Sequence, residues 1–346
     1  MEKELWKYLQ TAKKPIVLYG MGNGADKIIN VLDSYGIPVS GVFASDGFVR
    51  EKYFHSHKIM SYSALKEKYR DMIVLLCFGS QLPEVMENIL KIAAEQELYA
   101  PEVPVIGGGL FTEEYYLNNK PSFDWVYSRL CDDISKKTFE NIINYKISGK
   151  IDYLLECRVE TTEPYNSFLK LEKENFIDLG AYNGDTVLQF VKNCPDYTHI
   201  TAVEPDFKTF KKLKANTADI RNIELVNACV SDKCGKALFN MKGGRNSSIG
   251  SGTETECITV DSLNLNATFI KMDVEGEEIS AVLGAKDTII KNKPKMLISA
   301  YHRTEDLISI PETVLGINPE YKMYIRHFPY LPAWDTNFYF VPKKEK

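Results

Sequence analysis

The stretch that decides the expected fold is Asn175-Phe176-Ile177-Asp178-Leu179-Gly180-Ala181-Tyr182-Asn183-Gly184-Asp185-Thr186. Its first residues are mainly apolar, as in a buried strand, and a helix-like segment follows the glycines. Gly180 permits a tight turn, and Gly184 leaves room for a ligand where a side chain would block it. An ordinary strand-to-helix turn would also favour glycine and aspartate, so this stretch alone predicts a strand–turn–helix unit that is suited to a cofactor.

Strand signals recur downstream of this stretch. They fall at residues 199–203, 223–230, 268–272, 295–300, 321–327 and 336–341. Alternation of strands with helical patterns indicates a parallel α/β sheet. The last two strands lie close together with prolines in the gap, which suits an antiparallel pair at the end of the sheet. Between Asp232 and Asp261 the helical pattern lapses, and we expect a hairpin-like insertion there, with Ser247 and Ser248 in a loop.

A second strand–glycine–helix opening stands near the N-terminus, where Gly20-Met21-Gly22-Asn23-Gly24 follows an apolar run. Strand signals at 39–44 and 72–78 complete a small Rossmann-like α/β pattern. Asp46 follows the second strand, where a ribose ligand would be expected. A lone glycine motif is weak. A nucleotide or nucleotide-sugar site and a degenerate interaction domain therefore both remain open.

The two α/β series are separated by a segment of helical periodicity. Its apolar residues recur at helical spacing and include Leu130, Ile134, Phe139, Ile142 and Ile143. We interpret this segment as a helical connector. Because each half has its own strand–helix series, we expect residues from about 165 onward to fold alone.

Composition narrows the class of partner. The chain has 346 residues, of which 44% are hydrophobic, and its net charge of −5 offers no electrostatic footprint for nucleic acid. Small molecules or uncharged polymers suit it better. No apolar run approaches the roughly 18 residues of a membrane span. Seven dispersed cysteines without a CxxC pair predict reduced thiols and a cytoplasmic location. Association into homo-oligomers stays open.

An acidic residue stands where a ribose would be bound. Glu204, followed by Pro205, ends the second strand of the C-terminal series about 20 residues beyond the glycine loop, and it can accept both ribose hydroxyls. The alternative is a solvated loop carboxylate. Asp178 and Asp185 flank the glycine loop and would repel a pyrophosphate, whereas they suit an amino-acid tail beside a sulfonium cation. The residues therefore favour S-adenosylmethionine over a dinucleotide.

The C-terminal half, from about Leu171 to Val341, resembles the FkbM family of methyltransferases. The resemblance rests on the glycine stretch, on Val203-Glu204-Pro205, on Lys271-Met272-Asp273-Val274-Glu275-Gly276-Glu277-Glu278 and on Ile298-Ser299-Ala300-Tyr301-His302. It implies a class I, Rossmann-like fold with a seven-stranded, mostly parallel sheet. It also implies methyl transfer from S-adenosylmethionine to oxygen, often on sugars or natural products. Tyr182 and Asn183 depart from the pattern of many relatives.

With this resemblance, we expect a Rossmann-like domain at 1–120, the helical connector at 121–165 and a methyltransferase domain at 166–346. We assign cofactor contacts to the glycine stretch, the second strand end and the later strand ends. The residues are Asp178, Gly180, Ala181, Tyr182, Gly184, Asp185, Thr186, Glu204, Pro205, Ala228 and Asp273.

The chemistry is assigned to Asp273, Glu275 and His302, which follow neighbouring strands. A hydroxyl acceptor needs its proton removed or its oxygen polarised. His302 could be the general base. Alternatively, a bound divalent cation could polarise the acceptor oxygen. We assign no residue as a metal ligand. The two carboxylates could instead only cap the next helix. Arg326 and His327 end a further strand and could either orient the acceptor or belong to the rim.

Two other functions compete with methyl transfer. The N-terminal glycine loop is compatible with an NAD-dependent oxidoreductase, although no Tyr-x-x-x-Lys or comparable constellation stands out. A non-catalytic nucleotide-binding scaffold would retain both folds. The leading hypothesis is an S-adenosylmethionine-dependent O-methyltransferase that acts on a small-molecule or saccharide hydroxyl.

Overall fold

The N-terminal part of the chain is built on a six-stranded sheet. A computed structural model describes residues 2–45, 53–240, 248–249 and 253–343. The strands run in the order β3-β4-β2-β1-β5-β6, and only the β3–β4 pair is antiparallel. Their bounds are Ile16–Tyr19 (β1), Gly41–Ala44 (β2), Tyr53–Phe54 (β3), His57–Ser61 (β4), Ile73–Leu76 (β5) and Glu97–Tyr99 (β6). The accompanying helices are Leu5–Thr11 (α1), Asn23–Ser34 (α2), Tyr62–Tyr69 (α3) and Pro83–Glu95 (α4).

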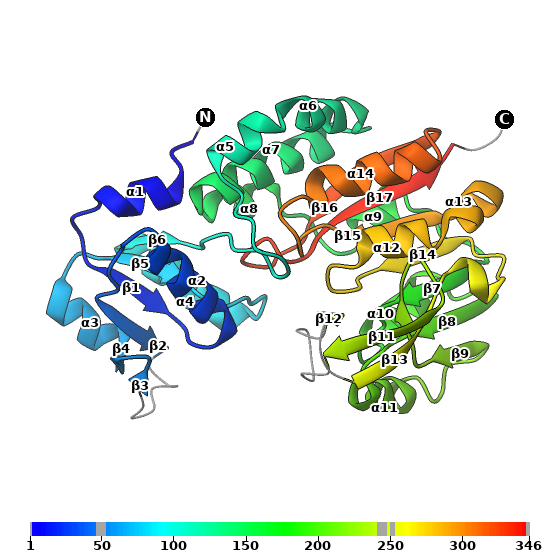
Figure 1. Cartoon of the computed structure of the whole chain (residues 1–346), viewed down its shortest axis with the longest axis horizontal. Helices are drawn as coiled ribbons and strands as arrows, with labels where there is room; N and C mark the ends of the chain where they lie inside the picture. The colour runs from blue at the N-terminus through cyan, green and yellow to red at the C-terminus, as the bar shows by residue number, and fades with distance from the viewer. Residues whose placement is uncertain (1, 46–52, 241–247, 250–252, 344–346) are drawn as a thin grey trace.

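Helices follow this sheet, and those between residues 113 and 148 lie along the top of the molecule in Figure 1. They are Glu113–Asn118 (α5), Lys120–Arg129 (α6), Asp133–Ser148 (α7), Asp152–Cys157 (α8) and Glu163–Ser167 (α9). The longest, α7, begins where the Asp132 carboxylate accepts a hydrogen bond from the backbone N–H of Ser135. It ends at Gly149, whose φ of 67° is left-handed. The sequence thus sets both ends of the helix locally.

The C-terminal part contains the expected seven-stranded sheet, in the order β16-β17-β15-β14-β7-β8-β9. Its strands are Asn175–Leu179 (β7), His199–Val203 (β8), Ile223–Val226 (β9), Phe269–Met272 (β14), Lys295–Ser299 (β15), Tyr321–His327 (β16) and Thr336–Pro342 (β17). Only β17 runs antiparallel to its neighbours, β15 and β16. The helices are Asp185–Asn193 (α10), Phe207–Asn216 (α11), Glu278–Leu283 (α12), Lys286–Asn292 (α13) and Asp306–Ile317 (α14). The prediction of a class I, Rossmann-like α/β fold is confirmed.

The predicted hairpin-like insertion is a small sheet of its own. It contains Cys229–Val230 (β10), Gly235–Asn240 (β11), Ser248–Ile249 (β12) and Thr253–Ile258 (β13), followed by a 3-10 turn at Asp261–Leu263. A disulfide joins Cys229 to Cys257, which are direct partners across β10 and β13. The expectation that all the cysteines are reduced is therefore wrong. The two cysteines are 28 residues apart, and only strand pairing brings them together.

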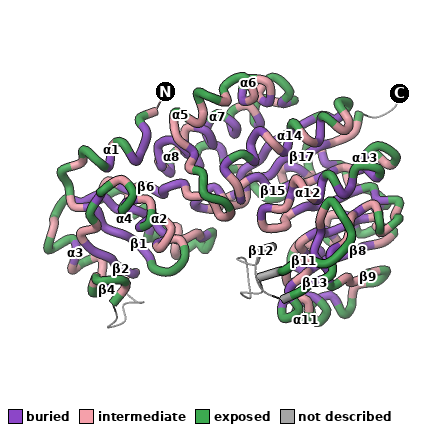
Figure 2. Tube along the Cα trace, viewed as in Figure 1, coloured by how far each residue is buried: buried purple, intermediate pink, exposed green. Residues whose placement is uncertain are grey.

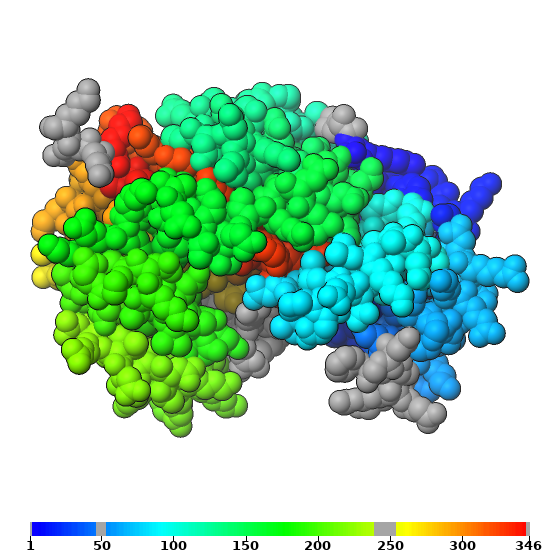
Figure 3. All heavy atoms as spheres, turned by 180° about the vertical axis from the view of Figure 1, so that it is seen from behind, coloured from blue at the N-terminus to red at the C-terminus, as the bar shows by residue number. Residues whose placement is uncertain are grey.

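One continuous core joins the three parts. It includes Val74 of β5, Phe139 of α7 and Ile298 of β15, all buried. Figure 2 shows buried chain running from the N-terminal sheet through the helices into the C-terminal sheet. From behind, atoms of the C-terminal strands, in red, are visible between the green helical segment and the cyan N-terminal segment (Figure 3). Within the residues described, no helix is both long and apolar enough to cross a membrane.

Candidate active site

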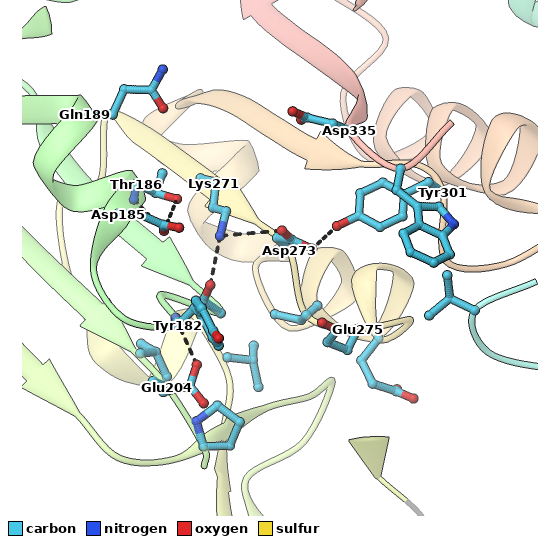
Figure 4. Close-up of a pocket in the computed structure, with 18 of the residues that line it drawn as sticks. Tyr182, Asp185, Thr186, Gln189, Glu204, Lys271, Asp273, Glu275, Tyr301 and Asp335 are labelled. Atoms are coloured by element: carbon cyan, nitrogen blue, oxygen red, sulfur yellow. Dashed lines mark hydrogen bonds and ion pairs between the residues drawn. The ribbon is translucent and has the colours of Figure 1, made fainter. Parts of the chain in front are cut away.

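A cavity of about 400 Å³ opens at the carboxyl ends of β7, β8, β14 and β15. Ligands of open α/β sheets bind at this edge, and the volume is that of a small-molecule site. Figure 4 shows its walls, with Glu204 and Tyr182 at one end and Tyr301 at the other. We call the first the donor end and the second the acceptor end.

The glycine loop brings the ends of β7 and β14 together. A Cβ on Gly180 would lie 1.8 Å from the backbone oxygen of Asp273, and the φ of Gly180 is +75°. Only glycine fits there. Gly184 serves packing instead, because its Cβ would meet Thr217 at 2.9 Å. This differs from the expected role of Gly184 in ligand approach.

Glu204 is fixed at the donor end by two backbone donors. Its Oε2 accepts the N–H of Tyr182 at 3.0 Å, and its Oε1 accepts the N–H of Asp206 at 2.8 Å. Burial raises the pKa of Glu204 to about 7, although both N–H groups favour the carboxylate. The side chain faces the cavity and can accept further hydrogen bonds from a ligand.

Asp178 was predicted to contact the cofactor, but it does not line the cavity. Its side chain is fully buried and pairs with Lys271 Nζ at 3.1 Å. The two residues are direct partners across β7 and β14. Lys271 Nζ also donates to the backbone oxygen of Gly180 at 2.8 Å. Burial opposes the charge on Lys271, but the carboxylates of Asp178 and Asp273 outweigh it and raise its pKa. The pair therefore supports the loop from beneath.

Asp273 and Glu275 both line the cavity, and Asp273 lies between its two ends (Figure 4). Asp273 Oδ1 accepts the hydroxyl of Tyr301 at 3.1 Å, and its Oδ2 is 4.0 Å from Lys271 Nζ. Glu275 has a left-handed φ of 53°. Such strain in a non-glycine residue is concentrated at functional sites.

His302 differs from the sequence-based prediction, because its ring does not line the cavity. It is 1% exposed and lies behind the carboxylates, with Nδ1 3.0 Å from Glu278 Oε1 and Nε2 3.5 Å from Asp273 and Glu275. Burial alone would lower its pKa, but the charges of Glu278, Asp273 and Glu275 raise it to about 10. The imidazole therefore keeps its proton at neutral pH and cannot accept another.

The remaining residues that the sequence assigned to the site fall into those that line the cavity and those that do not. The cavity is lined by Gly180, Tyr182, Asp185, Thr186, Glu204, Pro205, Asp273 and Glu275. Ala181 and Ala228 are buried beside it rather than in its wall. Arg326 and His327 are buried elsewhere: Arg326 pairs with Asp132 and Glu163, and His327 bonds Thr336. Asp46 and Ser247 lie outside the described residues.

Several lining residues were missed. They are Gln81, Val105, Thr161, Gln189, Val203, Cys229, Val230, Lys271, Val274, Glu277, Tyr301, Tyr330, Trp334 and Asp335. The sequence could have indicated Lys271, because a lysine inside an apolar strand needs a buried carboxylate as its partner. Gln81 carried no such signal, since it lies far away in the sequence.

Packing requires two glycines of the N-terminal motif. A Cβ on Gly20 would lie 2.5 Å from Phe78 Cδ1, and one on Gly24 would lie 2.3 Å from the backbone oxygen of Cys77. Both glycines let the first strand and its helix approach the end of β5. These contacts account for Gly20 and Gly24, whereas a Cβ on Gly22, which has a φ of +107°, would meet no heavy atom within 4 Å.

The C-terminal part has the Rossmann-like class I fold, and its cavity lies at the carboxyl edge of the sheet. Residues 178–327 match the family model described as the methyltransferase FkbM domain. This match supports a methyltransferase, and with it an enzyme. No curated protein matches the sequence significantly.

A solved structure shares the fold. The chain is similar to a methyltransferase FkbM from Methylobacillus flagellatus KT, with 22% identity, a TM-score of 0.72, and 95% of this chain and 90% of that chain covered. A precorrin-6y C5,15-methyltransferase from Geobacter metallireducens GS-15 is 14% identical with a TM-score of 0.35, covering 53% and 87%. Aeropyrum pernix fibrillarin with S-adenosyl-L-methionine is 14% identical with a TM-score of 0.32, covering 49% and 67%.

Proposed function

We propose that the protein transfers a methyl group from S-adenosylmethionine to a hydroxyl group of a saccharide or other small polar acceptor. The observation that carries this proposal is one continuous cavity that holds Glu204 at one end and Asp273, Glu275 and Tyr301 at the other. S-adenosylmethionine would supply an electrophilic methyl group on its sulfonium. The protein must then align an acceptor with that methyl group and receive its proton.

The donor end fits the nucleoside part of this cofactor. Glu204 presents a carboxylate edge to the cavity at the end of β8, where it can accept two ribose hydroxyls. Gly180 keeps the loop backbone close to the end of β14. Asp185 and Asp273 add negative charge that favours a cationic sulfonium. Asp178 acts through Lys271, as a positioning residue.

Asp273 is the group that we propose receives the acceptor proton. It lies at the boundary of the two ends, in the cavity wall, and its side chain is 31% exposed. The Tyr301 hydroxyl fixes one of its oxygens at 3.1 Å, which directs the carboxylate. General-base assistance of this kind contributes roughly 10²–10⁴-fold to a rate. Glu275 would bind a second acceptor hydroxyl.

His302 takes a positioning role in this proposal. As an imidazolium it lies 3.5 Å from both Asp273 and Glu275, and it lowers the cost of holding two carboxylates close together. This replaces the general-base role that the sequence suggested for it.

The divalent-cation alternative would use Asp273, Glu278 and His302, whose ligand atoms lie within 4.8 Å of one another. A metal there would have to displace the proton that the His302 ring holds among three carboxylates. We therefore propose a reaction that needs no divalent cation. Activity should survive excess EDTA, and loss of activity that Mg²⁺ or Mn²⁺ restores would favour the cation.

The experiment that tests the function combines binding and turnover. Calorimetry should show that S-adenosylhomocysteine binds the full chain. Mass spectrometry of a panel of methyl glycosides, polyols and phenols incubated with S-adenosylmethionine should then show the gain of one methyl group. Asp273→Asn should keep the affinity for S-adenosylhomocysteine and lose roughly 100-fold or more in turnover. Absence of binding by the wild-type chain would refute the proposal.

A further inference from the structure

The N-terminal sheet reaches the acceptor end of the cavity directly. The segment after β5 forms a two-hydrogen-bond bridge with the loop between β16 and β17: Ser80 N–H donates to Leu331 O at 2.8 Å, and Leu331 N–H donates to Ser80 O at 3.0 Å. A Cβ on Gly79 would lie 2.6 Å from Trp334 and 2.7 Å from Tyr330. The contact is therefore close and specific, and it sets the next residue, Gln81, in the cavity wall.

The glycine motif of the N-terminal sheet supports the same segment. Gly20 and Gly24 admit Phe78 and Cys77 at distances that a side chain would forbid. These two glycines thus let the first βα unit position the end of β5. What it holds in place is the short stretch that ends at Gln81.

The chemistry of this end suits a sugar ring. Tyr301, Tyr330 and Trp334 present aromatic rings, and the ring centroids of Tyr330 and Trp334 are 6.2 Å apart. Aromatic faces pack against the apolar C–H faces of a pyranose. Its hydroxyls need acceptors and donors, which Asp273, Glu275 and the Gln81 amide supply.

The charge of the cavity restricts the acceptor further. Among the described residues in its wall are six carboxylates and one cation: Asp185, Glu204, Asp273, Glu275, Glu277 and Asp335 against Lys271. Lys271 is committed to Asp178 at 3.1 Å. Nearby Arg303 donates to the backbone oxygen of Gly276 at 2.6 Å and to Glu277 at 3.4 Å. A phosphate or carboxylate on the acceptor would meet repulsion on most sides.

We propose that Gln81 is a specificity-determining residue for the acceptor, and that the acceptor end takes saccharides that carry no phosphate or carboxylate group. This inference rests on the proposed function. It assigns the N-terminal sheet to the same cavity as the methyl donor, in place of a separate nucleotide site. An ammonium group on the sugar is favoured, because the surrounding carboxylates attract it.

The test uses the full chain saturated with S-adenosylhomocysteine and three probes that share one ring: glucosamine, glucose and glucose 6-phosphate. Dissociation constants from ligand-observed NMR should rank glucosamine at least as tight as glucose, with glucose 6-phosphate not binding. Gln81 is exposed, so Gln81→Ala should fold normally. It should raise the constants for both binding sugars roughly tenfold, the effect of losing one good hydrogen bond, and leave affinity for S-adenosylhomocysteine unchanged.

Gln189→Ala is the matched control, because Gln189 lines the same cavity near Thr186 and away from Tyr301 (Figure 4). This variant should weaken the binding of S-adenosylhomocysteine and leave the dissociation constants of the sugars unchanged. The inference is overturned if no probe sugar binds, if glucose 6-phosphate binds as tightly as glucose, or if Gln81→Ala leaves sugar binding unaltered or weakens both ligands alike. Failure of S-adenosylhomocysteine to bind the wild-type chain would instead refute the proposed function.

Discussion

At the scale of single residues, Glu204 links burial to donor binding. Its pKa of about 7 means that it is about half protonated at neutral pH. Ribose hydroxyls donate to the carboxylate, so binding should favour the ionised form and lower this pKa. Affinity for S-adenosylhomocysteine should therefore rise between pH 6 and pH 8. Charge-assisted hydrogen bonds contribute about 1.5–3 kcal/mol, so Glu204→Gln should weaken binding roughly ten- to a hundredfold.

Calorimetry across this pH range measures both effects. Glu204→Gln should also flatten the pH dependence, whereas exposed Glu320→Gln, at the start of β16, should change neither quantity. An unchanged affinity and slope in Glu204→Gln would remove Glu204 from the donor site.

His302 provides a second residue-scale prediction. Its pKa of about 10 lies above the ordinary value of 6.5, so the protonated ring stabilises the folded state. That contribution is fully present below pH 6.5 and is lost as the pH rises through 10. Ring ¹⁵N shifts at pH 8 should show both nitrogens protonated. The difference in melting temperature between wild type and His302→Gln should shrink toward pH 10. Titration of the ring near pH 6.5 would contradict the imidazolium assignment.

Sequence reasoning located residues whose position is set by local pattern. Gly180 and Glu204 stand at strand ends, where the fold places ligands, and both line the cavity. It misplaced Asp178, because only strand register shows that this carboxylate faces Lys271 rather than solvent. It misjudged His302 because the ring's charge depends on three carboxylates, of which Glu278 on α12 was not considered.

At the scale of elements, apolar patterning predicted the C-terminal strands and the antiparallel end of the sheet, because β16 and β17 are long and separated by prolines. It missed α1 and the β3–β4 pair, which are short and partly exposed. The Cys229–Cys257 pairing was also missed, since no local motif marks it. Features that depend on contacts between distant segments produce no periodic pattern in the sequence, so they could not be predicted from it.

Strand β16 is attached to the helices by a buried ion-pair cluster. The Arg326 side chain is 0% exposed, and its guanidinium contacts Asp132 at 2.7 Å and Glu163 at 2.6 Å. Removing one partner of a buried pair costs about 3–5 kcal/mol, and the partial exposure of both carboxylates places Arg326→Met at the lower end. Denaturant unfolding should show that loss. Arg326→Lys should recover only part of it, because lysine lacks the bidentate fork.

Lys343→Met is the comparison variant for this element. Lys343 pairs with Glu320 at 3.2 Å with both side chains largely exposed, and such pairs contribute at most about 1 kcal/mol. Equal losses in Arg326→Met and Lys343→Met would show that the buried cluster does not hold β16.

At the scale of the whole molecule, we expect the segments 1–120, 121–165 and 166–346 to depend on one another for stability, although they follow one another along the chain as separate series of elements. The helical segment covers the outer edge of β16. Cys131 N–H donates to Met323 O at 3.0 Å, and Val159 N–H donates to His327 O at 2.9 Å. The loop after β6 reaches the site as well, since Ile106 N–H donates to His302 O at 2.9 Å.

These contacts revise the expectation that residues from about 165 onward fold alone. A fragment of residues 166–346 would expose the edge of β16 and would leave the buried Arg326 without its partners Asp132 and Glu163. We expect it to aggregate. A longer fragment, residues 101–346, keeps helices α5 to α9, the Lys146–Glu102 pair and the Ile106–His302 contact, and lacks the N-terminal sheet with helices α1 to α4. It should still bind S-adenosylhomocysteine, because the donor end is built after residue 175, but it should melt at a lower temperature than the full chain, because it loses Val74 and the rest of the N-terminal share of the common core. Size-exclusion chromatography and calorimetry on both fragments decide the matter: a soluble 166–346 fragment with full affinity would show that the connector is dispensable.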